Sequence, residues 1–115
     1  MTVLVLLFFE AATFVFASLL HSGVLITGYE HQKARIAEGV IGVVLLLGAV
    51  SIWIRPEWTR KAGLAAQAFA FLGTLIGVFT VVIGIGPHTV PDIVYHLAIV
   101  AVLVWGLILT DRTSA

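Results

Sequence analysis

The fold is decided by the first apolar run, residues 2–26, which reads TVLVLLFFEAATFVFASLLHSGVLI. A transmembrane helix needs about 20 mostly apolar residues, and only Glu10 and His21 place ionisable side chains in this run. A secretory signal would begin with a basic region and end at a small-residue cleavage site. Residues 2–20 contain no Lys or Arg and continue directly as apolar chain. We therefore expect a retained membrane-spanning helix.

The whole chain has the same apolar character. Hydrophobic residues make up 61% of its 115 residues and charged residues 10%, with a mean hydropathy of +1.16. A soluble domain carries roughly 25% charged residues, so we expect the lipid bilayer to be the main partner of this chain. The formal net charge is zero, which provides no basic field for nucleic acid. The absence of cysteine excludes disulfides and thiolate metal sites.

Three further apolar runs follow the first one, and short polar connections separate them. Pro56 interrupts the chain between the second and third runs. Thr89 can cap the fourth run, and Pro91 suits its first turn. Short connections favour antiparallel neighbours. We predict an all-α integral membrane protein, a single domain over residues 1–115, built as an up-down-up-down bundle of four transmembrane helices. The predicted spans are residues 2–26, 36–54, 62–85 and 91–110.

The placement of Lys and Arg predicts the orientation. Two basic residues, Lys33 and Arg35, lie in the connection between the first two spans, whereas four lie on the opposite side. The positive-inside rule then puts both termini in the cytoplasm, with the protein in a plasma or inner membrane. The opposite face receives all four histidines of the chain. The four basic residues on the cytoplasmic side are Arg55, Arg60, Lys61 and Arg112.

Histidines and carboxylates are predicted to meet near the extracytoplasmic face. His21 and His96 lie at similar depth, and Asp92 is four residues before His96, so that these two share a helix face. Asp92 could orient the imidazole of His96, and Glu38 in the first turn of the second span reaches the same level. The pattern predicts a site for haem, held by two axial histidines, or for a divalent transition metal. The alternative is that these are interfacial polar residues that water satisfies.

Two other histidines are weaker candidates for this site. His31 and His88 lie in the connections on the same side of the membrane. They could complete a four-histidine cluster, but a histidine in an exposed loop is usually solvated.

Glu10 lies near the middle of the first span, where a charged carboxylate costs several kcal/mol. It shares a helix face with His21, because eleven residues make close to three turns, and Gln67 is at a comparable depth in the third span. One interpretation is an interhelical hydrogen-bond clasp formed by Glu10, Gln67 and the indole of Trp105. The other is a proton-coupled transporter of a small solute, in which Glu10, Gln67 and Tyr95 bind the proton or the substrate.

Small residues at four-residue spacing, such as Gly73 and Gly77, indicate close helix packing. That packing could lie within the chain, in a homodimer, or against a larger membrane complex in which the chain is a non-catalytic accessory subunit. No Ser/His/Asp arrangement has recognisable spacing. We therefore predict no catalytic residues.

The layout resembles that of the small multidrug exporters, which have about this length, four spans and one carboxylate deep in the first span. The motifs differ, because this chain has Leu20-His21-Ser22-Gly23 where that family has a lysine, and it has no Trp-Ser-Gly. The paired histidines also resemble those of membrane b-type cytochromes. Both resemblances concern only the arrangement of the spans and of their polar residues, and we assign no site residues from either family.

Overall fold

Four long α-helices account for most of residues 2–113, which are the residues that this computed structural model describes. Of these described residues 83% are helical, and each of the four long helices is apolar enough to cross a membrane. The predicted all-helical class and the predicted number of long apolar helices are therefore confirmed. In chain order the elements are α1 (Thr2–Ser22), α2 (Gln32–Ile54), the 3-10 turn η1 (Pro56–Trp58), α3 (Thr59–Val82) and α4 (Val90–Asp111).

The helix ends differ from the predicted spans for local reasons. Helix α1 ends at Ser22 because Gly23 adopts a positive φ of 79°, a conformation that glycine accepts readily. Helix α2 begins at Gln32, four residues earlier than predicted, because the His31 side chain caps it by accepting a hydrogen bond from the backbone N–H of Ala34. Helix α3 ends at Val82, shortly before Gly84, which has a φ of 87°.

The start of α4 is held by a capping box. The hydroxyl of Thr89 accepts from the backbone N–H of Asp92 at 3.3 Å, and the Asp92 carboxylate accepts from the backbone N–H of Thr89 at 3.1 Å. This reciprocal pair satisfies two backbone donors that a helix start leaves free, and Pro91 occupies the first turn. The cap therefore fixes the position of the Asp92 carboxylate.

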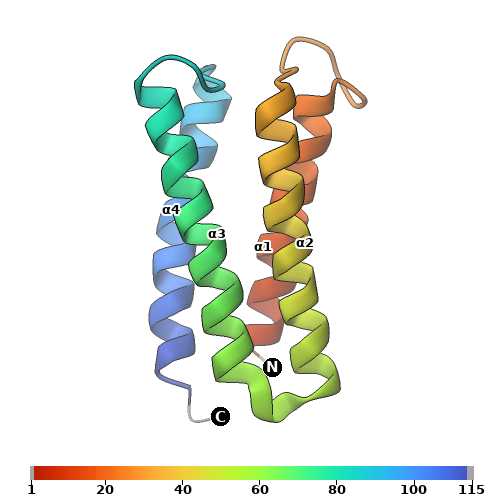
Figure 1. The fold of residues 1–115 in the computed structure, drawn as a ribbon, viewed down its shortest axis with the longest axis vertical. Helices are drawn as coiled ribbons and strands as arrows, with labels where there is room; N and C mark the ends of the chain where they lie inside the picture. The colour runs from red at the N-terminus through yellow and green to blue at the C-terminus, as the bar shows by residue number, and fades with distance from the viewer. Residues whose placement is uncertain (1, 114–115) are drawn as a thin grey trace.

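The helices associate as two pairs. Helix α1 packs mainly on α2 and α4 mainly on α3, and contacts between α2 and α3 join the pairs. Figure 1 shows the connections 23–31 and 83–89 together at the top, with η1, the start of α1 and the end of α4 at the bottom. We call these the upper and lower ends. The molecule measures 43 × 25 × 16 Å.

The core contains leucine and small residues from all four helices, including Leu7, Leu45, Ala70 and Leu103, which are fully buried. Glycines allow close approach inside the chain. A Cβ on Gly48 would lie 2.8 Å from the Cβ of Ala66, and one on Gly73 would lie 2.8 Å from Ile41. Many large apolar side chains instead face outward.

Candidate functional site

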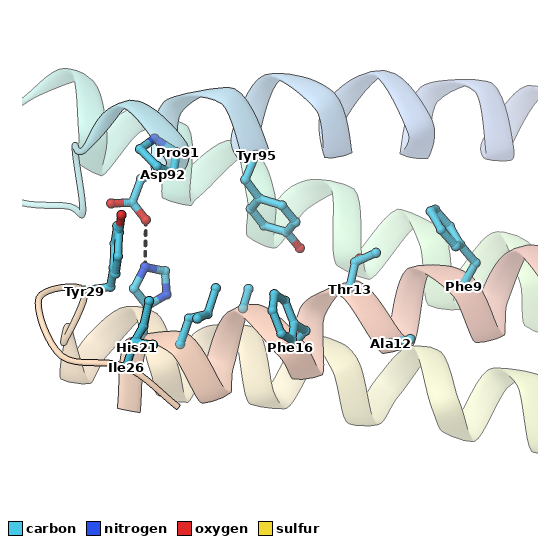
Figure 2. Close-up of a pocket in the computed structure, with 12 residues that line it drawn as sticks. Phe9, Ala12, Thr13, Phe16, His21, Ile26, Tyr29, Pro91, Asp92 and Tyr95 are labelled. Carbon is cyan, nitrogen blue, oxygen red and sulfur yellow. Dashed lines mark hydrogen bonds and ion pairs between the residues drawn. The ribbon is translucent and has the colours of Figure 1, made fainter. Parts of the chain in front are cut away.

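His21 binds two carboxylates, one through each nitrogen of its ring. Its Nδ1 lies 2.5 Å from Glu38 Oε1, and its Nε2 lies 2.8 Å from Asp92 Oδ1. Figure 2 shows the bond between His21 and Asp92 reaching from α1 to α4. All three residues are buried. We call Glu38, His21 and Asp92 the His21 cluster.

Each member of the His21 cluster is positioned by a nearby backbone feature. The backbone carbonyl of His21 accepts from the N–H of His31 at 2.9 Å, which ties the end of α1 to the start of α2. Glu38 lies in the second turn of α2, because that helix begins earlier than predicted. Asp92 is held by the capping box, and its Oδ2 also accepts from the hydroxyl of Thr89 at 2.5 Å. Both Asp92 oxygens are therefore occupied.

The two contacts of His21 require two protons. A neutral imidazole has one N–H donor and one acceptor nitrogen, whereas an imidazolium donates from both nitrogens. The cluster therefore holds either an imidazolium between two carboxylates, or a neutral imidazole with one carboxylate and one carboxylic acid. In the first state both hydrogen bonds are charge-assisted, which makes them the stronger kind.

His96 differs from its predicted role. The Asp92 carboxylate binds His21 and not His96; the Nδ1 of His96 instead donates to the backbone carbonyl of Asp92 at 2.7 Å. The spacing of four residues places the His96 ring beside the backbone carbonyl of Asp92, one turn earlier in the same helix, while the Asp92 carboxylate is turned toward Thr89 and His21. The Nε2 of His96 faces Gly77, where a Cβ would lie 3.3 Å away.

Two cavities adjoin the His21 cluster. The larger one, which we call the α1–α4 groove, has a volume of about 560 Å³ and includes His21, Asp92 and Tyr95 in its lining. The second cavity has a volume of about 230 Å³, and Glu38, Tyr95 and His96 line it. Tyr95 therefore borders both cavities, whereas His21 and His96 border different ones. This arrangement gives no support to a haem held between His21 and His96.

His31 and His88 form separate local contacts. His31 caps α2 through Nδ1, and its Nε2 donates to the carbonyl of Ile85 at 3.1 Å, which joins the two connections at the upper end. The Nδ1 of His88 donates to the carbonyl of Gly86 at 2.9 Å. Within residues 2–113, no group of three or more His, Asp or Glu side chains is arranged to hold a metal ion.

Glu10 and Gln67 meet at the level of Gly106. The amide nitrogen of Gln67 donates to the carbonyls of Gly63 and Gly106 and to the hydroxyl of Thr110, which directs its Oε1 toward the interior. Three buried oxygens here have no hydrogen-bond partner among the described residues. They are both carboxyl oxygens of Glu10 and the Oε1 of Gln67.

Gly106 provides the space for these oxygens. A Cβ at Gly106 would lie 3.0 Å from Glu10 Oε2 and would collide with Gln67 Oε1. Three acceptors gathered here need a donor, and a proton on Glu10 would supply it. The geometry therefore favours a clasp of Glu10 and Gln67 between α1, α3 and α4. Trp105, which was predicted as its third member, is instead exposed, and the α4 contacts come from Gly106 and Thr110.

Thr89 was predicted as the cap of the fourth span, which the capping box confirms. Sequence reasoning did not identify Gly106 and Thr110 as contributors to the polar group at Glu10. Gly106 and Thr110 are four residues apart and so share a helix face, which is a signal available before folding. Comparison with protein-family models, with curated proteins and with solved structures finds no significant match. The functional proposal therefore rests on the geometry of the site.

Proposed function

We propose that the four helices cross a lipid bilayer in up-down-up-down order, with both termini in the cytoplasm. Each helix contains an 18-residue window of mean hydropathy between 1.9 and 2.4, and side chains such as Phe9, Leu72 and Phe79 face outward. Monomeric soluble proteins rarely expose apolar surface so extensively. The excess of Lys and Arg at the lower end supports a cytoplasmic position for that end. The His21 cluster then lies near the extracytoplasmic face.

In this proposal the protein is a ligand-binding membrane protein, and the His21 cluster is the polar centre of its site. One observation carries the proposal: three ionisable side chains from three helices are buried together between two cavities. A buried ion pair is a weak means of stabilising a fold, because desolvation offsets its attraction. Ionisable residues inside membrane-spanning helices are functional by default.

The proton is the species that this cluster is best arranged to exchange. A metal ion lies about 2.0–2.2 Å from each nitrogen or oxygen ligand. The paired atoms are 2.5 and 2.8 Å apart, so they would have to separate before an ion could lie between them. The geometry therefore favours proton exchange over binding of haem or of a divalent transition metal.

Nuclear magnetic resonance of ¹⁵N-histidine-labelled protein in lipid nanodiscs tests this proposal. We expect His21, identified by the signal lost in His21→Asn, to change protonation state as the pH is varied over the range in which the protein stays folded, because its imidazole can carry one proton or two. Glu38→Gln should shift that transition, whereas His88→Asn should not. A His21 signal that stays unchanged over this range would contradict proton exchange. Stoichiometric metal, or a Soret band lost in His21→Ala, would assign the site to a metal or haem instead.

A second candidate function is proton-coupled transport of a small solute through Glu10. The observation that favours it is a fully buried carboxyl group at mid-span whose oxygens have no partner among the described residues. In this case the proton on Glu10 would exchange during transport, and a partner subunit would complete the path. Flux into proteoliposomes that persists in Glu10→Gln would exclude this function.

A further inference from the structure

The α1–α4 groove has the size of a small-molecule site. Its volume of about 560 Å³ falls in the usual range of about 300–1,000 Å³. The groove follows α1 from Phe9 to His21, which corresponds to about 18 Å at 1.5 Å per residue. Figure 2 shows Phe9 at one end and the pair of His21 and Asp92 at the other, with Tyr95 and Thr13 between them. An occupant would therefore be elongated.

The charged groups at the upper end of the groove are already engaged. Both ring nitrogens of His21 are bonded to carboxylates, and both oxygens of Asp92 accept hydrogen bonds. A charged ligand would therefore have to break the His21 cluster to form an ion pair. The rest of the lining is almost entirely apolar. These two features favour an uncharged occupant.

Two tyrosines line the groove: Tyr29 is half-buried at its upper end, whereas the Tyr95 hydroxyl lies midway along it and is the one with unused hydrogen-bonding capacity in the interior. It is buried and has no hydrogen-bond partner among residues 2–113. Figure 2 shows it pointing across the groove toward Thr13. No hydrogen bond joins the two hydroxyls, and that of Thr13 donates to the backbone carbonyl of Glu10 at 2.8 Å. A phenol is a good hydrogen-bond donor, so this position calls for an acceptor oxygen.

We infer that the α1–α4 groove binds a neutral, elongated, largely apolar molecule whose carbonyl oxygen accepts a hydrogen bond from Tyr95. The ring of Tyr95 is held in place by edge-on contacts with Phe14 and His96, so its hydroxyl is directed before a ligand arrives. Such a molecule dissolves in the bilayer and can enter between α1 and α4. This inference rests on the proposed binding function, since the His21 cluster closes the upper end of the groove.

Photolabelling with benzophenone, a neutral aromatic ketone, tests the inference on the full chain in nanodiscs. We expect light-dependent labelling of residues that line the groove, such as Thr13 and Phe16, located by mass spectrometry. Tyr95→Phe should weaken binding about threefold to tenfold, the effect of losing one hydrogen bond. Diphenylmethane, which has the same skeleton without the carbonyl, should compete poorly with benzophenone for binding to the wild-type protein. For binding to Tyr95→Phe, the two compounds should compete about equally, because neither can gain the hydrogen bond.

Two substitutions separate the groove from the general lipid-facing surface. Ala12→Phe places a ring in the groove and should abolish labelling there, whereas Ala65→Phe adds the same ring to an exposed position of α3 and should have no effect. Labelling spread evenly over the outward faces, or equal binding by wild type and Tyr95→Phe at unchanged thermal stability, would overturn the inference.

The two proposals fail separately. If His21 changes protonation state with pH but Tyr95→Phe has no effect on benzophenone binding, the ligand class is wrong and the His21 cluster keeps its proposed role. If His21 does not change protonation state while benzophenone binding still depends on Tyr95, the inferred ligand class stands and the proposed role of the His21 cluster in proton exchange is wrong.

Discussion

The imidazole of His21 and the carboxylate of Asp92 are bonded at 2.8 Å although 71 positions separate them in the chain. His21 lies in the last turn of α1, which packs on α2, and Asp92 lies in the first turn of α4, which packs on α3. Their hydrogen bond therefore joins the two helix pairs at the upper end. With the contact between His31 and the Ile85 carbonyl, it holds together the end of the bundle that contains both cavities.

Asp92→Asn should destabilise the protein by about 1–3 kcal/mol, because the buried histidine loses a charged acceptor. Thermal unfolding in nanodiscs measures the effect. The matched control is Asp111→Asn, which removes a carboxylate from an ion pair with Arg60 that is 2.5 Å long but about half exposed. Exposed pairs contribute about 0–1 kcal/mol. Equal effects of the two substitutions would show that the bond to His21 contributes no more than a surface pair.

Glu10→Gln should leave stability nearly unchanged, within about 1 kcal/mol, because an amide N–H can donate to Gln67 Oε1 as a protonated carboxyl group does. Glu10→Ala should cost about 1–3 kcal/mol, since the Gln67 oxygen would stay buried without a donor. Chemical unfolding of both variants in the same detergent checks the difference. If Glu10→Gln costs as much as Glu10→Ala, Glu10 is not the donor of the clasp.

Gly106→Ala should destabilise the bundle by about 1–3 kcal/mol, the usual effect of overpacking. The added Cβ would collide with Gln67 Oε1 and lie 2.9 Å from Leu6 Cδ2. Gly39→Ala is the control within α2, where the nearest atom would lie 3.4 Å away. This change should be neutral or stabilise by about 0.5–1 kcal/mol, because alanine favours a helix interior. Unfolding midpoints that shift in the same direction would contradict the packing described at Gly106.

Single cysteines should report the proposed orientation, because the chain has none of its own. In intact cells, Thr27→Cys in the upper connection should react with a membrane-impermeant maleimide. Thr59→Cys at the lower end should react only after the membrane is permeabilised. The reverse pattern would show that the His21 cluster faces the cytoplasm and that the small excess of Lys and Arg does not determine the topology.

Most residues of the site could be expected from the sequence, but the hydrogen bonds between them could not. The shared level of His21, Glu38 and Asp92 follows from their positions near helix ends. The partner of each group does not follow, since the spacing of Asp92 and His96 suggested a pair that the capping box with Thr89 prevents. The clasp at Glu10 was expected to involve Gln67 and Trp105, but Trp105 is exposed. Gly106 and Thr110, which direct the Gln67 amide, were not expected.

The sequence by itself determined that there are four long apolar helices and roughly where each one ends. Helix formation in an apolar run and its interruption at Gly23, Pro56 or Gly84 depend on interactions within a few residues. Only the tertiary structure decided that His21 binds Glu38 and Asp92 rather than His96. That choice depends on how each helix is rotated about its axis, which is set by the packing of small residues such as Gly73 and Gly106 against side chains from distant parts of the chain.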